Sequence, residues 1–299
     1  MDQSTAQALS PCDWFLAKGR IIHCRERPLI MGIVNVTPDS FYDGGHYAAP
    51  EQAVAHALEL VEQGADILDI GAESTRPGAQ PVNEADEAAR LIPVVRELAR
   101  RVQVPISVDT TKAKVAQLAL DAGAAIVNDI SAMQLDEEMA AVVARAGAAI
   151  VLLHMQGTPQ TMQASPQYED VVAEVAQFLE ARLQAALRAG IARTNIVLDP
   201  GIGFGKLLVH NLDLLNGLSS LAMLKRPLLV GLSRKAFIGQ ITGRSVTHRE
   251  WGTAAAVALA VDRGAQVLRV HDVAMMADVV KVAAAVKSRA SSARQEHYA

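Results

Sequence analysis

Residues 29–36 read LIMGIVNV, a continuous apolar run that ends near an asparagine. Similar runs follow along the chain: ILDIGA at 67–72, PISVDT at 105–110, AIVNDIS at 125–131, AIVLLHM at 149–155, IVLDPG at 196–201, PLLVGLS at 227–233 and VLRVHDV at 267–273. Continuous apolar runs are typical of strands buried on both faces of a parallel sheet. Eight such strands alternating with helical stretches predict an α/β fold, the (β/α)₈ TIM barrel. An open doubly wound sheet is the alternative, but its glycine-rich first turn is absent.

The connections between these runs also repeat. Gly64-Ala65, Gly123-Ala124, Gly147-Ala148 and Gly264-Ala265 each precede a predicted strand, where glycine suits the left-handed residue that ends a helix. Residues 83–101 carry an N-cap candidate, Asn83, with acidic residues in the first turn and basic residues in the last. A helix is therefore predicted there.

Composition and charge narrow the class of protein. The 299 residues are 51% hydrophobic, 20% charged and 4% aromatic, which excludes intrinsic disorder and favours tightly packed helix-on-sheet layers. The net charge is −4 and basic residues are not clustered, so nucleic acid is not expected as a partner. No apolar run reaches the ~18 residues of a membrane span and no signal peptide is recognisable, which predicts a cytoplasmic protein without membrane association.

The chain divides into three predicted parts. Residues 1–28 form an N-terminal extension with a small hairpin, which we expect to plug the N-terminal end of the barrel. Residues 29–286 form the barrel, and residues 287–299 form a C-terminal tail. Cys12 and Cys24 could face one another across the hairpin strands, although reduced packing thiols are the preferred interpretation.

Polar residues gather where the predicted strands end, which is the catalytic face of a TIM barrel. They are Asn35; Glu73, Ser74, Thr75 and Arg76; Asp109 and Thr110; Asn128 and Asp129; His154; Asp199; Ser233, Arg234 and Lys235; and Arg269 and His271. Because unpaired buried polar groups are unfavourable, one shared pocket explains them best. Thr110 and Asp129 are equally well explained as local caps of the following helices.

Two kinds of chemistry are indicated by these side chains. Asp109, Asn128 and Asp199 lie within or at the end of apolar strands and suit a flat heterocycle with an amino-pyrimidine edge. Arg76, Lys235, Arg269 and His271 suit a phosphate or pyrophosphate. Lys235 could instead form a Schiff base, as in barrel aldolases. The segments TPDSFYDGG at 37–45 and GAESTRPGAQP at 71–81 are predicted to be mobile lids.

A set of motifs then points to one family. MGIVNVTPDSF, GAESTRPGA, SVDT, NDIS, HMQGTP, DPGIGFGK, GLSRKAFIG and RVHDV occur in this order from about Leu29 to the last helix. In this respect the chain resembles the dihydropteroate synthases of folate biosynthesis. The resemblance implies that p-aminobenzoate displaces diphosphate from 6-hydroxymethyl-7,8-dihydropterin diphosphate with the help of Mg²⁺. It also implies a sulfonamide target and a homodimer.

The resemblance assigns roles by motif position. It implies that Asp39, Asp109 and Lys235 are catalytic, and that Asn35 reaches the metal. The implied pterin and diphosphate residues are Thr75, Asp109, Asn128, Met155, Asp199, Lys235, Arg269 and His271, and the implied p-aminobenzoate residues are Arg76, Pro77, Phe204 and Ser233. The amine is a competent nucleophile without a strong base, which agrees with the absence of a Ser-His-Asp arrangement.

The sequence differs from the family's usual motifs at a few positions, and two alternative functions remain open. Ala236 stands where the family often has a hydroxyl residue, and LLVHN follows GFGK where a threonine is usual nearby. A pterin-dependent methyltransferase would not need STRPGA or SRK, and an inactive pterin-binding paralogue is the other alternative. The Ala-rich helices near residues 254–261 and 279–286 could pair in a homodimer or pack on the barrel.

Overall fold

The computed structural model describes residues 13–23, 27–36, 45–75 and 77–296. These residues form a two-stranded hairpin and an eight-stranded parallel sheet. The strands are β1 Asp13–Phe15, β2 Ile21–His23, β3 Leu29–Asn35, β4 Ile67–Gly71, β5 Ile106–Asp109, β6 Ile126–Asp129, β7 Ala149–Leu153, β8 Ile196–Asp199, β9 Leu229–Gly231 and β10 Val267–Val270. The eight predicted strands are therefore all present.

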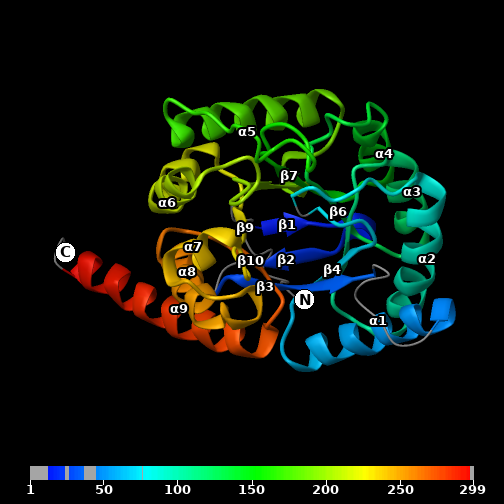
Figure 1. Cartoon of the computed structure of the whole chain (residues 1–299), viewed down its shortest axis with the longest axis horizontal. Helices are drawn as coiled ribbons and strands as arrows, with labels where there is room; N and C mark the ends of the chain where they lie inside the picture. The colour runs from blue at the N-terminus through cyan, green and yellow to red at the C-terminus, as the bar shows by residue number, and fades with distance from the viewer. Residues whose placement is uncertain (1–12, 24–26, 37–44, 76, 297–299) are drawn as a thin grey trace, which may run out of the picture.

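Helices separate the strands of the large sheet. They are α1 Gly45–Glu62, α2 Glu84–Arg101, α3 Ala113–Ala122, α4 Met139–Ala146, α5 Val171–Arg188, α6 Leu208–Asn216, α7 Ala236–Thr242, α8 Glu250–Asp262 and α9 Val273–Glu296. Figure 1 shows these helices arranged around the central strands, with α9 projecting toward the C-terminus. Helix α9 continues to Glu296 and so enters the segment assigned above to a C-terminal tail.

The sheet order is β8-β7-β6-β5-β4-β3-β10-β9, and all its strand pairs are parallel. The two outer strands meet through a parallel bridge between Leu198 and Leu228, and the Leu198 amide donates to the carbonyl of Pro227 at 3.0 Å. This contact brings the sheet round into a barrel, so the open-sheet alternative is wrong. Because every strand has helices outside it and side chains inside it, the strands are buried almost throughout, which explains their continuous apolar sequences.

The N-terminal hairpin lies at the N-terminal end of the barrel strands. Trp14 is fully buried, and its indole N–H donates to the carbonyl of Asn195, directly before β8. The side-chain amide of Asn195 in turn donates through Nδ2 to the carbonyls of Gly147 and Ala148, directly before β7. The predicted plug is thus anchored opposite the functional face. Cys12 and Cys24 lie outside the described residues.

Helix ends follow the predicted signals. Asn83 caps α2 by accepting from the amide of Asp86 at 2.9 Å. Gly123 ends α3 with φ of 123°, a conformation that L side chains rarely adopt. Its packing is also close, because a Cβ there would lie 2.5 Å from the Cβ of Ala99 on α2. Such short turns connect each of these helices to the following strand within a few residues.

Among the described helices, none combines the length and apolar character that a membrane span requires.

Candidate active site

A cavity of about 1380 Å³ opens at the C-terminal ends of the barrel strands. The structure brings together in its wall twelve of the residues singled out from the sequence: Asn35, Glu73, Ser74, Thr75, Pro77, Asp109, Phe204, Ser233, Arg234, Lys235, Arg269 and His271. They come from β3, the loop after β4, β5, the loop after β8, the turn after β9, and β10 with its following residue. One site therefore draws on most of the barrel.

The other predicted residues are placed differently. Asn128 and Asp199 are almost fully buried and do not line this cavity. Met155 is half-buried and is likewise absent from the lining. Asp39, Arg76 and the first predicted lid, apart from Gly45, lie outside the described residues.

A charged cluster occupies the interior end of the cavity. Arg269 donates through Nε to Oδ2 of Asp69 at 2.6 Å and through Nη2 to Oδ2 of Asp109 at 2.9 Å. Asn128 Nδ2 also donates to Asp69 Oδ2, at 3.1 Å. Asp69 on β4 thus connects the predicted residues on β10 and β6. Sequence reasoning did not assign it, although an acid inside the apolar run ILDIGA was an available signal.

Burial changes the acidity of the carboxyl groups in this region. It raises the pKa of Asp109 to about 7, although the neighbouring Arg269 guanidinium opposes that rise. It also raises the pKa of Asp199 to about 6, against the opposing effects of a hydrogen bond from the Gly201 amide and of the Lys235 ammonium. Burial alone would lower the pKa of Arg269, but the carboxylates of Asp69 and Asp109 outweigh it, and that pKa is raised. The cation is therefore permanent, while the carboxyl groups can exchange protons near neutral pH.

Lys235 lies across the loop that follows β8. Its Nζ is 4.2 Å from the centre of the Phe204 ring, a cation–π distance. Gly203 makes this approach possible, because a Cβ there would come within 3.0 Å of Lys235 Cδ. Burial lowers the pKa of Lys235 to about 8, although Asp199 opposes the change. No hydrogen bond or ion pair holds its ammonium within the described part of the chain, so it is available to a ligand.

The turn that carries Lys235 is fixed by its neighbours. Arg234 adopts a left-handed φ of 57°, and its guanidinium binds both carboxylate oxygens of Asp272, at 3.2 and 2.6 Å. Arg249 Nη1 donates to the carbonyls of Arg234 and Lys235 at 3.0 and 3.3 Å. Because Asp272 follows His271 in the sequence, this ion pair also connects the turn after β9 to the diphosphate-binding candidates on β10.

Ser233 and His271 are in direct contact. Ser233 Oγ lies 2.9 Å from His271 Nδ1 and also accepts from the His271 backbone N–H at 3.2 Å. The contact fixes one ring nitrogen of His271 in the cavity wall. It places a residue expected to contact the diphosphate beside one expected to contact p-aminobenzoate.

The loop after β8, residues 200–206, is shaped by close backbone contacts. Gly201 has φ of 69°, and a Cβ there would lie 1.8 Å from the carbonyl oxygen of His154. Its amide donates to Oδ1 of Asp199 at 2.7 Å. Asn211 on α6 accepts from the amide of Gly203 at 2.6 Å. Glycine is therefore required by geometry here.

The loop after β4 is held by a second charged group. Lys112, just before α3, binds the carboxylates of both Glu73 and Glu87. Glu87 is fully buried in the first turn of α2, and burial raises its pKa despite the hydrogen bond from Lys112. Further along this loop, the Gly78 amide donates to the carbonyl of Pro159 at 3.0 Å. These contacts anchor both ends of the predicted second lid where the structure describes it.

Thr110 and Asp129 have local structural roles. The Thr110 hydroxyl accepts from the amide of Lys112 at 3.2 Å. Asp129 accepts from the amides of Ser131 and Met133 and from the Ser131 hydroxyl, at 2.7 to 2.8 Å. These bonds use both Asp129 oxygens to fix the loop after β6. Neither residue is a helix cap as predicted, because the N-cap positions of α3 and α4 are Lys112 and Glu138. Both side chains bind the loop that directly follows their strand.

A metal would have few protein ligands here. Within the described ranges, no group of three or more histidine, cysteine, aspartate or glutamate side chains is arranged to hold an ion. Asn35 contributes an amide to the cavity wall at the end of β3. Mg²⁺ commonly keeps several waters and binds one or two protein oxygens together with substrate phosphates. The lining therefore fits a metal carried largely by a diphosphate, and does not form a dedicated cage.

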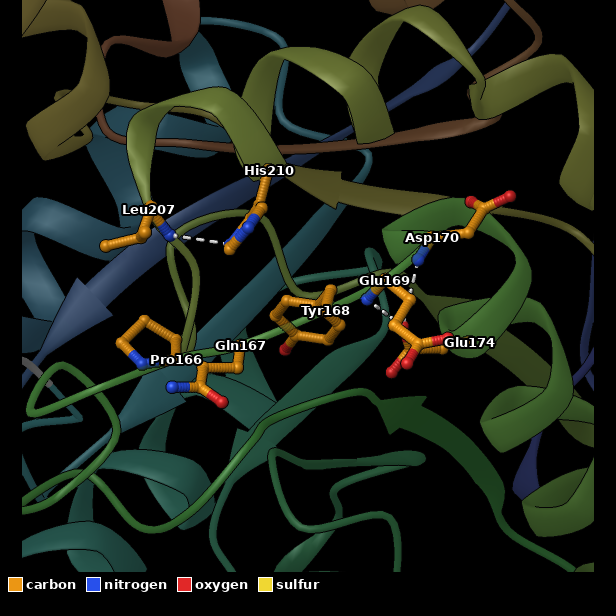
Figure 2. A pocket seen from close by; sticks show the side chains of 8 residues that line it. All are labelled: Pro166, Gln167, Tyr168, Glu169, Asp170, Glu174, Leu207 and His210. Carbon is orange, nitrogen blue, oxygen red and sulfur yellow. Dashed lines mark hydrogen bonds between the residues drawn. The ribbon is translucent and has the colours of Figure 1, made fainter.

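A second cavity, of about 710 Å³, lies between the start of α5 and the start of α6 (Figure 2). Its lining is Pro166, Gln167, Tyr168, Glu169, Asp170, Glu174, Leu207 and His210. Three of these side chains are acidic, and the amides of Glu169 and Asp170 donate to Glu174 Oε1. The acidic lining does not suit a diphosphate. The larger cavity, with Lys235 and Arg269, is the candidate active site.

Comparison with known proteins gives a consistent result. Residues 31–271 match the family model described as pterin binding enzyme. A dihydropteroate synthase from Synechocystis sp. is 46% identical over 262 residues, which cover 87% of this chain and 91% of that protein. A Xanthomonas albilineans dihydropteroate synthase solved with 4-aminobenzoic acid has a TM-score of 0.86 at 47% identity, covering 93% of this chain and 99% of that one. A second structure from that organism, in complex with 7,8-dihydropteroate, has a TM-score of 0.82 at 44% identity, covering 91% and 98%.

Proposed function

We infer the function of this chain from its family, because it belongs to the pterin-binding enzymes and, within them, to the dihydropteroate synthases. It is a transferase that condenses a dihydropterin diphosphate with p-aminobenzoate to give 7,8-dihydropteroate and diphosphate. The methyltransferase and the inactive paralogue are accordingly not adopted.

The pterin is proposed to bind at the interior end of the cavity, between Asp109, Asn128 and Asp199. The observation that carries this placement is a set of buried oxygens on three adjacent strands that find no hydrogen-bond partner among the described residues: Asp69 Oδ1, Ser107 Oγ and Asn128 Oδ1. Unsatisfied buried acceptors are unfavourable, and an amino-pyrimidine edge supplies the N–H groups that they lack. Carboxyl groups with a raised pKa, at Asp109 and Asp199, can bind either a ring N–H or a ring nitrogen.

The diphosphate is proposed to bind at the cationic side, against Arg269, His271 and Thr75, with Lys235 between it and the ring. Asn35 would hold Mg²⁺, which when bound neutralises charge on the leaving diphosphate. The permanent cation of Arg269 and the free ammonium of Lys235 stabilise the same negative charge as the C–O bond breaks. The resemblance also assigns Asp39 to this metal-bound state, and that role stays a prediction.

The amine is proposed to enter beside Phe204, Pro77 and Ser233, with Arg76 closing the pocket. Diphosphate leaves first with the electrons of the C–O bond, which gives a pterin-methylene cation, and the nitrogen lone pair then forms the new C–N bond to the methylene carbon. The nitrogen then loses one proton to water or to the diphosphate. No side chain has to act as a strong base, because an aniline nitrogen is already an uncharged nucleophile at neutral pH.

Product formation tests this assignment directly. Labelled 7,8-dihydropteroate is measured from the two substrates with Mg²⁺, in the wild type and in Lys235→Ala and Arg269→Ala. Both variants should lose at least about a hundredfold in kcat/KM, whereas Lys114→Met, an exposed lysine on α3, should behave as the wild type. Full activity in either cavity variant would refute the assigned role of that residue, and no product from the wild type would refute the proposed reaction.

A homodimer through α8 and α9 is also proposed. Leu259, Val282 and Val286 on these helices are 47%, 67% and 68% exposed, and the two helices pack on one another. Apolar side chains exposed to this degree are favourable once covered by a second copy. The cytoplasmic location remains a prediction.

A further inference from the structure

Lys206, the last residue of DPGIGFGK, carries a buried ammonium that sequence reasoning did not assign. The residue is 3% exposed. Its Nζ donates to the carbonyls of Gly201 and Phe204 at 2.9 and 3.0 Å and approaches that of His154 at 3.5 Å. Nζ also lies 2.9 Å from His154 Nδ1. A lysine ammonium has three N–H donors, so these neutral acceptors use its full capacity.

The imidazole of His154 completes this set of neutral acceptors. Burial, reinforced by the adjacent Lys206 ammonium, lowers the pKa of His154 to about 3. The ring is therefore neutral at physiological pH, and its Nδ1 accepts from Lys206. Burial lowers the pKa of Lys206 to about 7, although the Asp199 carboxylate opposes the change. In the described ranges the Lys206 ammonium has no carboxylate among its hydrogen-bond acceptors. The Lys206 ammonium is surrounded by the backbone carbonyl oxygens of His154, Gly201 and Phe204, as a bound monovalent cation would be.

This ammonium controls the backbone on which Phe204 lies. It binds the carbonyls of residues 201 and 204, and the Phe204 amide donates back to the Gly201 carbonyl at 3.0 Å. The turn is thus closed from both sides. Glycines at 201, 203 and 205 all have positive φ, so the loop has little intrinsic preference for this shape. Without the ammonium, three carbonyls that now converge would repel one another.

We propose that Lys206 is a positioning residue for the amine substrate: its ammonium fixes the 201–204 turn so that the Phe204 ring forms one wall of the p-aminobenzoate pocket. This inference rests on the proposed function. It predicts a larger effect on the amine substrate than on the pterin. Asp199 and Lys235 do contact the loop, through the Gly201 amide and the Phe204 ring. However, the backbone of Lys235 is also held by Arg249, and Asp109 is held by Arg269.

Chemical rescue provides the test. Lys206→Ala removes the three outer methylene groups and the ammonium, which together correspond to n-propylammonium. Because Lys206 reaches the wall of the open cavity, the added amine has a route to the space that the ammonium leaves. We expect KM for p-aminobenzoate to rise about tenfold or more, with the Kd of the pterin diphosphate within about threefold of the wild type. Propylammonium should bring KM back toward the wild-type value.

The controls separate positioning from general damage. Tetramethylammonium at equal ionic strength has no N–H donor and should not rescue, and Lys114→Met should leave both constants unchanged. Equal KM for p-aminobenzoate in Lys206→Ala and wild type would overturn the inference. So would an equal loss for both substrates that propylammonium fails to reverse, since Lys206 would then support only the fold. An inactive wild type would instead refute the proposed function itself.

Discussion

Substitution of Asp69 is the sharpest test of the charged cluster inside the barrel. Asp69→Ala removes the acceptor of Arg269 Nε and of Asn128 Nδ2 in one step. Removing one partner of a buried ion pair destabilises a protein by about 3–5 kcal/mol, because the remaining charge stays desolvated. Arg269 keeps its bond to Asp109, and its side chain is 21% exposed to the cavity, so water can replace part of the loss. We therefore expect a decrease of about 3 kcal/mol in the free energy of unfolding.

A surface ion pair supplies the matched control. Asp278 pairs with Lys281 on α9, with side chains 80% and 65% exposed, and such a pair contributes under about 0.5 kcal/mol. Urea unfolding of both alanine variants, followed by the fluorescence of buried Trp14 and by circular dichroism, gives the two decreases. If they differ by less than about 1 kcal/mol, the Asp69 cluster does not stabilise the fold as argued.

The remaining predictions concern backbone strain, pH and metal. Gly201→Ala and Gly243→Ala face the same left-handed φ of about 70°, but only the Cβ at 201 meets a carbonyl oxygen at 1.8 Å. Thermal melting should therefore show a small loss for 243 and failure to fold normally for 201, and equal losses would contradict the geometry. The pKa of Asp109, about 7, lies above its unfolded value near 3.8, so the free energy of unfolding falls as pH rises through this window. Asp109→Asn should make that fall shallower in urea titrations from pH 4 to 8, and an unchanged slope would show that Asp109 does not titrate there. EDTA should abolish product formation while calorimetry still detects a pterin without diphosphate, and metal-independent turnover would remove Mg²⁺ from the proposal.

Local sequence patterns were sufficient to predict the barrel. Continuous apolar runs, glycine before several of the strands and the Asn83 cap are properties of neighbouring residues, and the structure has all eight strands and the predicted α2. Burial on both faces removes the alternation of polar and apolar residues, and this signal is readable without knowing which strands pair. The C-terminal end of α9 could not be predicted, because residues 288–296 carry no apolar periodicity and are nevertheless helical.

The candidate site was only partly accessible to the same reasoning. The position of a polar residue at the end of a strand indicated that it faces the cavity, and ten such residues line it. The sequence could not distinguish Asp129, whose oxygens bind its own loop, from Asp109, whose carboxylate binds Arg269 from 160 residues away. That difference depends on where a side chain points after folding.

By itself, then, the sequence determined the fold class, the family and most of the residues that face the cavity, because these are recorded in periodicity and in ordered motifs. Only the tertiary structure decided that Asp69 joins β4, β6 and β10, and that Lys206 binds the carbonyls of two loops. Both are single charged residues within apolar or glycine-rich segments. The partners of Asp69, and His154 among the partners of Lys206, are distant in sequence. The free energy of these buried charges therefore depends on contacts that the neighbouring residues do not reveal.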